Sequence, residues 1–248
     1  MITTRILVLL AYYPENDLVE NTPALSAKGS LAPFFVYRGE ELVLRESTAG
    51  GSVLGLPKAR FYDALFALKD HSRVAQVVTD DGVYRFYRDR VRAKYRYKDG
   101  SDELLSRLVV YKESYLEPVD PVLADAWRVT EGLVEQLARE VAGDGARFGL
   151  SIISTPIQAY PDPRVRAAFA ERVGAADLFH SERRLQRLGE RLGFPVLALG
   201  PPFQEHADAH GVHLHGFAKG GPGIGHWNVE GHRLAAEMLA GAICEGWR

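Results

Sequence analysis

Apolar stretches alternate with amphipathic ones along most of the chain. Residues 5–12 are apolar at nearly every position, which is typical of a central strand in a parallel sheet that helices cover on both faces. Short apolar runs at 148–153 and 196–199 predict two more strands. Apolar residues recur at helical spacing over 122–141 and over 229–244, where we expect two helices. This order of elements predicts an α/β fold with a parallel sheet and right-handed crossover connections.

Two shorter helices are expected between the second and third of these strands. The first covers about residues 164–173, and the second continues from Ser181 to Leu192. Ser181 is expected to be the N-cap of its helix, because a serine hydroxyl can accept hydrogen bonds from the free N–H groups of the first turn.

The region after the first strand departs from this rhythm. Residues 14–17 are expected to form a polar turn at the end of the strand. Two short apolar runs, 34–37 and 42–45, flank a polar segment that contains a glycine and therefore predict a small hairpin.

The following seventy or so residues, up to residue 118, give a weaker pattern. Gly and Pro residues precede an apolar periodicity that predicts a helix over 59–78. Residues 80–118 combine high charge with weak periodicity, and we interpret them as an insertion. The chain as a whole, 1–248, is expected to be a single domain that carries this insertion.

The composition is that of an ordinary globular protein. Of the 248 residues, 46% are hydrophobic and 25% are charged, which excludes collagen-like and intrinsically disordered classes. The formal net charge is −2, so no overall attraction to nucleic acid is expected. The single cysteine, Cys244, excludes an internal disulfide.

No membrane or export signal is predicted. The longest apolar run, 6–13, has eight residues, whereas a membrane-spanning helix needs about 20. The same run resembles the core of a short signal peptide, but no cleavage site of small residues follows it. A cytoplasmic location is therefore the default expectation, with export of a longer, complete protein left open. The sequence does not indicate the oligomeric state.

His226 and Asn16 are the candidate catalytic residues. His226 lies in a loop directly before the last helix, where the backbone can fix the ring and leave one nitrogen free for general-base catalysis. A hydrogen-bonded surface histidine is the simpler alternative. Asn16 follows the first strand, and ligands of open parallel sheets bind beyond the carboxyl ends of strands, where an amide could stabilise an oxyanion. The alternative role of Asn16 is an Asx turn that ends the strand.

Two motifs carry a family resemblance. They are residues 14–17 (Pro-Glu-Asn-Asp), after a predicted strand, and residues 226–228 (His-Trp-Asn), before a predicted helix. In this order they resemble the SGNH (GDSL-type) hydrolase superfamily, which has Gly-x-Asn-Asp after a strand and a later catalytic His followed by Asn and a helix. Pro14 stands in the position of the Gly. The resemblance implies a three-layer, flavodoxin-like α/β sandwich with a mainly parallel sheet.

The resemblance also implies a function for the complete protein. It would be a serine ester hydrolase that acts on a small-molecule or carbohydrate ester, with no cofactor and no metal. His226 would be the general base and Asn16 an oxyanion-hole donor. Asn228 would orient the loop, while Trp227 would line the acyl or sugar site or merely pack.

Several features depart from the family pattern. The Gly-Asp-Ser block that holds the nucleophile, and the Gly block after it, do not precede the first strand here. Gly223 stands where the family has an acidic residue, and Asp208 is a weak substitute. Ser52 lies in a Gly-x-Ser-x-x-Gly stretch but lacks the strand–turn–helix context of a nucleophile. We therefore expect the C-terminal portion of such a hydrolase without its first strand, either truncated or a pseudo-enzyme, with negligible ester hydrolysis.

A non-catalytic binding or metal-binding α/β protein is the alternative. Six of the eight histidines lie within 206–232, and His206 and His210 are spaced to share one helix face. His213 or His215 could supply a third ligand. Cationic and aromatic residues alternate over 84–98, which suits polyanion binding, but we interpret this segment as a solvated face and expect no nucleic-acid partner.

Overall fold

The computed structural model describes residues 6–26, 33–45, 71–72, 103–109, 111–217, 221–245 and 247. The chain divides into two compact units, Met1–Val19 with Tyr97–Arg248 and Glu20–Arg96, and each is described by itself. The single domain over 1–248 stays a prediction.

Some sequence expectations fall outside the described residues. Of the helix predicted over 59–78, only residues 71–72 are described. Ser52 and the alternating segment 84–98 also lie outside the described residues.

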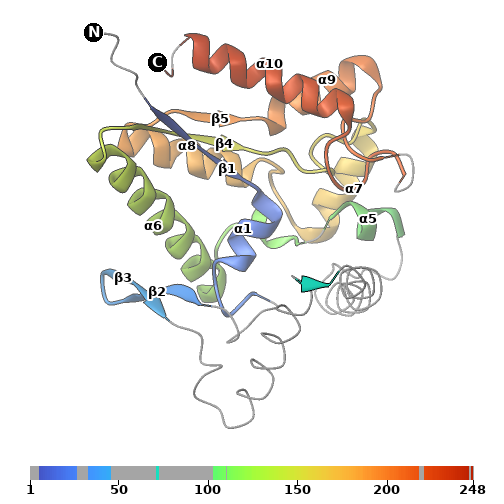
Figure 1. The fold of residues 1–248 in the computed structure, drawn as a ribbon. Coiled ribbons are helices and arrows are strands. Elements are labelled where there is room, and N and C mark those ends of the chain that lie inside the picture. The colour runs from blue at the N-terminus through green and yellow to red at the C-terminus, as the bar shows by residue number, and fades with distance from the viewer. Residues whose placement is uncertain are drawn as a thin grey trace. The chain divides into compact units, whose positions relative to one another are not determined.

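The larger unit contains a three-stranded parallel sheet in the part of the chain that the structure describes (Figure 1). Its strands lie in the order β1 (Leu7–Tyr12), β4 (Arg147–Ile152) and β5 (Val196–Ala198). All of residues 148–152 in β4 are buried, whereas only Tyr12 of β1 is. The mainly parallel sheet is confirmed, but its central strand is β4 rather than the predicted strand 5–12. In the described sheet β1 pairs with β4 alone, and Ile6 beside it is 63% exposed.

Helices cover both sides of this sheet, as expected for the α/β class (Figure 1). The helices of the larger unit are α1 (Pro14–Glu20), α5 (Glu103–Leu108), α6 (Pro121–Gly143), α7 (Pro163–Val173), α8 (His180–Leu192), α9 (Gly200–His210) and α10 (Val229–Glu245). Helices α6 and α8 lie against one face, while α9 and α10 lie on the other. A Cβ on Gly149 of β4 would lie 2.7 Å from the ring of Trp247, so only glycine allows the chain after α10 to pack this closely. No described helix is long and apolar enough to cross a membrane.

Local signals explain where the long helix α6 begins. Asp120 is its N-cap, with a side chain that accepts hydrogen bonds from the N–H groups of Val122 and Leu123, and Pro121 occupies the first turn. Seven residues on the inner face of α6 are buried, among them Trp127. The helix predicted over 122–141 is therefore confirmed.

Two local predictions near helix starts are wrong. Residues 14–17 form the first turn of α1 rather than a polar turn, and the Asp17 carboxylate accepts a hydrogen bond from the N–H of Tyr13 at 2.8 Å. Ser181 is not an N-cap, because α8 begins at His180 after Phe179. The Ser181 hydroxyl instead donates to the carbonyl of Ser114, 2.7 Å away.

The end of the predicted insertion belongs to the core of the larger unit. Leu105 and Leu108 of α5 and Tyr115 of the short 3₁₀ helix η4 (Glu113–Tyr115) are buried together with Ile157 and Phe169. Ile157 and Phe169 lie outside the predicted insertion, so the described residues 103–109 and 111–118 form part of the core of the unit rather than a peripheral addition.

The smaller unit contains the predicted hairpin. Strands β2 (Phe34–Arg38) and β3 (Glu41–Arg45) pair antiparallel, with Phe34 opposite Arg45 and Arg38 opposite Glu41. Gly39 in the turn has a φ of +66°, a conformation that glycine adopts without the strain other residues meet.

Candidate functional site

The carboxyl edge of the parallel sheet gathers polar residues from distant parts of the chain. Strand β1 ends at Tyr12, beside Ile152 of β4. The chain continues from β1 into α1, and from β4 into the loop that begins at Ile153. Ser154 and Thr155 lie in that loop, directly beyond the central strand. This edge is where open α/β sheets bind ligands.

Ser154, His215 and Trp227 form a hydrogen-bond network at this edge, in which Ser154 and His215 are buried and Trp227 is half-buried. The Nδ1 of His215 lies 2.9 Å from the carbonyl of Gly225, and a carbonyl only accepts, so Nδ1 carries the proton. The Nε2 of His215 therefore accepts from the hydroxyl of Ser154, 3.2 Å away. The indole N–H of Trp227 donates to the Ser154 oxygen at 2.8 Å. Every polar atom in the network has a partner.

This network fixes structure rather than presenting a nucleophile. A serine beside a histidine is also the arrangement of a catalytic pair. Here, however, Ser154 is 0% exposed and His215 is 3% exposed, so no substrate can reach them. Burial lowers the pKa of His215 to about 4, which keeps the ring neutral at physiological pH. The pair instead ties the loop after α9 to the end of β4.

Further hydrogen bonds close this loop into a defined shape. His215 and Trp227 form an antiparallel β-bridge, and the N–H of Gly216 donates to the carbonyl of His226 at 2.8 Å. The Asn228 amide donates to the carbonyl of His213 at 2.6 Å, and its oxygen accepts from the N–H of Gly231 at 2.9 Å. Asn228 thus caps the first turn of α10 and holds the loop against it.

His226 itself is exposed at the end of this loop. Its imidazole ring makes no hydrogen bond or ion pair with any described residue. Trp227, next to it, packs against Phe203 and His232, with ring centroids 5.2 and 5.5 Å apart. Its indole therefore serves at least to pack and to anchor the loop.

Asn16 is exposed in the first turn of α1, four residues beyond the end of β1. Strands β1 and β4 are parallel neighbours, so their carboxyl ends lie at the same edge of the sheet. Asn16 comes after β1 at this edge, and Ser154, to which Trp227 is hydrogen-bonded, comes after β4. A separation of about 10 Å between Asn16 and His226 stays a prediction.

Gly223 stands where the SGNH resemblance would place an acidic residue, and its surroundings exclude a side chain. Its φ is +79°, and a Cβ there would lie 2.8 Å from Nδ1 of His213 and 2.9 Å from the ring of Tyr160. Asp208 is no substitute, because both of its oxygens bind the guanidinium of Arg166, at 2.7 and 2.8 Å. Neither residue orients His226.

A second buried network, which the sequence did not reveal, holds α1 in place. The hydroxyl of Tyr115 lies 2.6 Å from a carboxylate oxygen of Glu15 and 2.8 Å from the hydroxyl of Thr155. All three side chains are buried. Burial, and then the charge of Glu15, raises the pKa of Tyr115 well above its usual value. The network fixes the helix turn on which Asn16 lies. Glu15 stands within the motif 14–17, but nothing local indicated that its partner would be 100 residues away.

A third buried polar group, Glu182 of α8, is linked to the loop after β4 through Gln158. Gln158 donates from its amide to Glu182 at 2.6 Å and accepts from the N–H of Thr155 at 2.9 Å. Burial raises the pKa of Glu182 to about 8, so this carboxyl is mostly protonated at neutral pH. Its second oxygen has no partner among the described residues.

The described serines do not offer a nucleophile at this edge. Within the larger unit, the serine side chains that the structure describes are Ser114, Ser151, Ser154 and Ser181, and all four are buried. The candidate site thus consists of an exposed histidine and an exposed asparagine on a buried, hydrogen-bonded support.

The histidines of the 206–232 region do not converge. The rings of His206 and His210 on α9 are 4.4 Å apart, and His206 Nε2 lies 3.5 Å from a carboxylate oxygen of Glu230. His215 is bonded to Ser154, and His213 packs against Tyr160. Across the described ranges, no group of three or more His, Cys, Asp or Glu side chains is arranged to hold a metal ion.

Comparisons with known proteins add no relative. No family model, curated protein or solved structure matches the chain significantly.

Proposed function

We propose that the carboxyl edge carries the base and oxyanion-donor half of a serine ester hydrolase of the SGNH type. One observation carries this proposal: the hydrogen bond from Trp227 to Ser154 ties the loop of His226 to the end of β4. Strand β4 lies beside β1, which leads directly to Asn16. In this proposal, two exposed polar residues that are 210 positions apart act at one edge of one sheet. We extend the proposal to the fold, as a flavodoxin-like, three-layer SGNH architecture.

In this proposal the two residues act on the same carbonyl group. His226 removes the proton from a serine hydroxyl as its oxygen attacks the ester carbonyl carbon, and later returns that proton to the leaving alkoxide. The amide of Asn16 donates a hydrogen bond to the oxyanion that forms, an interaction worth about 10²–10³-fold in rate. Trp227 and Asn228 form the substrate side of the loop. The ester class, a small-molecule or carbohydrate ester, remains the expectation from the resemblance.

The described part of the larger unit offers no accessible serine to act as the nucleophile, which limits the chemistry it can perform. Its serines in the larger unit are buried, and His226 has no orienting carboxylate. A base and one oxyanion donor cannot form an acyl-enzyme without a nucleophile. We therefore propose that this chain by itself hydrolyses esters negligibly.

A distance measurement tests the shared site. In a Cys244→Ser background, Asn16→Cys and His226→Cys are combined and treated with a bis-maleimide cross-linker that spans about 10 Å and adds one thiol at each end. We expect an internal cross-link, identified by mass spectrometry of the digested protein. The control pair is Asn16→Cys with Asp144→Cys. Asp144 precedes the opposite end of β4, about 20 Å away along the strand. Absence of a cross-link in the first pair, or equal cross-linking in both, would contradict the proposal.

An activity measurement tests the missing nucleophile. The full chain is incubated with p-nitrophenyl acetate, and we expect release of p-nitrophenol at the background rate. Ser52→Ala should behave as the parent chain does. Turnover well above background that Ser52→Ala abolishes would place the nucleophile at Ser52 and overturn the expected inactivity.

A further inference from the structure

A groove runs between α6 and α8, and its larger part lies at the end of the sheet opposite the carboxyl edge. It consists of two hollows, one of about 300 Å³ and one of about 350 Å³. The larger hollow reaches the amino ends of β4 and β5, at Arg147 and Pro195. Its position makes the groove independent of the site around His226.

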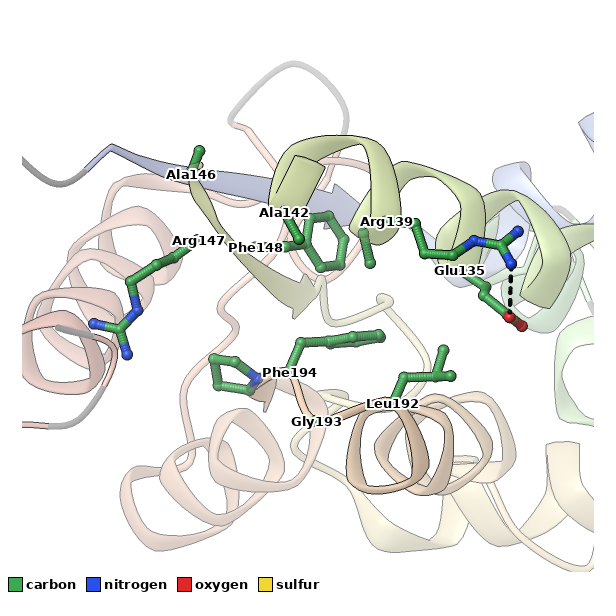
Figure 2. A pocket seen from close by; sticks show the side chains of 11 residues that line it. Glu135, Arg139, Ala142, Ala146, Arg147, Phe148, Leu192, Gly193 and Phe194 are labelled. Carbon is green, nitrogen blue, oxygen red and sulfur yellow. Dashed lines mark ion pairs between the residues drawn. The ribbon is translucent and has the colours of Figure 1, made fainter. Parts of the chain in front are cut away.

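The larger hollow is lined mainly by apolar residues (Figure 2). Ala138 and Ala142 of α6 form one wall, and Leu192 lies on the other. The rings of Phe148 and Phe194 form the floor, edge to face with centroids 5.0 Å apart. The small alanine side chains leave the space that these larger side chains do not fill.

The charged residues of this hollow stand at its margins. Figure 2 shows the guanidinium of Arg147 pointing away from the two phenylalanine rings. This follows from strand geometry, because neighbouring side chains in β4 point to opposite faces. On the α6 side, Arg139 forms an ion pair with Glu135 at 3.4 Å, and the arginine is 72% exposed.

The smaller hollow is cationic. Arg184, Arg187 and Arg191 of α8 are spaced three and four residues apart, so they share one face of the helix. Arg184 is already engaged: its Nε bonds to Glu131 of α6 at 2.5 Å, and its guanidinium lies 5.0 Å from the centre of the Trp127 ring. Arg187 and Arg191 are exposed and have no ion-pair partner among the described residues.

The two hollows follow one another along the same pair of helices. On α6, Glu131 lines the first and Glu135, one turn later, lines the second. On α8, Arg191 of the first is adjacent to Leu192 of the second. The groove is therefore amphipathic along its length, with a cationic end and an apolar end.

We propose that this groove binds an aliphatic carboxylate of medium chain length. The carboxylate would pair with Arg187 and Arg191, since guanidinium and carboxylate groups form strong, charge-assisted hydrogen bonds. The alkyl chain would lie over Phe148 and Phe194. A hollow of about 350 Å³ is in the range of known small-molecule sites. A sugar phosphate would leave the apolar end unused, and a neutral hydrocarbon would leave the arginines unused.

Calorimetric titration of the full chain with decanoate, below its micelle concentration, tests the proposal. Decanol and inorganic phosphate are the comparison probes. Decanol has the alkyl chain without the negative charge, and phosphate has the negative charge without the alkyl chain. We expect decanoate to bind at least about tenfold more tightly than either, a difference of about 1.4 kcal/mol. No binding of decanoate, or equal binding of decanol or of phosphate, would overturn the proposal.

Two variants locate the binding. Ala142→Phe fills the apolar end, and Arg191→Gln removes one cation; each should weaken decanoate binding about tenfold or more. The matched controls are Ala124→Phe, at an exposed position elsewhere on α6, and Arg172→Gln, on α7. Both controls should bind as the parent chain does. Unchanged binding in Ala142→Phe, with a parent-like thermal transition, would place decanoate elsewhere and contradict the proposal.

Discussion

The carboxyl edge of the sheet and the α6–α8 groove use polar side chains in opposite ways. At the edge, Ser154 and His215 are buried and Trp227 is half-buried, and the Ser154 hydroxyl is hydrogen-bonded to both of the other side chains. In the groove, Arg187 and Arg191 are exposed and lack ion-pair partners among the described residues. Burying a polar group without a partner is costly, so the polar groups of the edge satisfy one another and maintain its shape. Exposed, unpaired cations are free to meet a ligand.

The same contrast exists within the edge, between two histidines of one loop. His215 has both ring nitrogens engaged, while His226 has neither engaged with a described residue. If His215 supports the loop and His226 works at its surface, their removal should have very different consequences for folding.

The largest effect is expected from His215→Ala. It removes two hydrogen bonds, leaves the Ser154 hydroxyl and the Gly225 carbonyl without their partner, and opens a cavity, so the free energy of unfolding should fall by about 3 kcal/mol. His226→Ala should change it by less than about 0.5 kcal/mol, as is usual for exposed positions. Urea unfolding followed by tryptophan fluorescence measures both. Equal losses in the two variants would show that His226 is also part of the support.

A smaller effect is expected where α10 meets the loop. A Cβ on Gly231 would lie 2.3 Å from the backbone carbonyl oxygen of Leu214, so Gly231→Ala must displace the start of α10. We expect a loss of about 2 kcal/mol in the free energy of unfolding. Gly241→Ala, in the same helix, meets nothing within 4 Å and should gain up to about 1 kcal/mol from helix propensity. Thermal and urea unfolding compare the pair, and a stable Gly231→Ala would mean that the helix and the loop are not tightly coupled.

The smallest effect is the part of the pH dependence of Glu182 that falls between pH 6.5 and pH 8. Burial raises its pKa from 4.5 to about 8 in the folded protein, so between these values the folded state holds one more proton than the unfolded state. Stability from this group is therefore fully present below about pH 4.5 and is lost as the pH rises toward 8. His215, whose pKa falls from 6.5 to about 4, has the opposite effect, but only below pH 6.5.

The window between pH 6.5 and pH 8 thus isolates Glu182 from His215. Urea unfolding of the parent chain should show stability that declines across it, by up to about 1.4 kcal/mol per pH unit. Glu182→Gln keeps an oxygen that accepts from Gln158 but cannot ionise, so its stability should stay nearly constant. A decline of equal slope in both chains would assign the effect to another group.

Local sequence patterns determined much of the fold. The apolar runs of β1, β4 and β5 and the periodicity of α6 and α10 predicted these elements, and their order predicted a parallel sheet. Each of these strands and helices is encoded by residues that are close together in the sequence. Their apolar residues therefore recur at the spacing of a strand or of a helix, and this spacing can be read within a short window. The same holds for the hairpin of β2 and β3. The positions of Asn16 beyond β1 and of His226 before α10 also followed from the local pattern.

Tertiary packing decided which polar residues meet. Glu15 and Tyr115 are 100 residues apart, and Ser154 is 61 residues from His215 and 73 from Trp227. No local window contains both members of such a pair. Ser181 illustrates the point, since its sequence context favours an N-cap while the packed structure offers its hydroxyl the carbonyl of Ser114. Side chains of this kind bond to whatever group the folded chain brings within reach, because burial makes an unpaired polar atom more costly than a lost local cap.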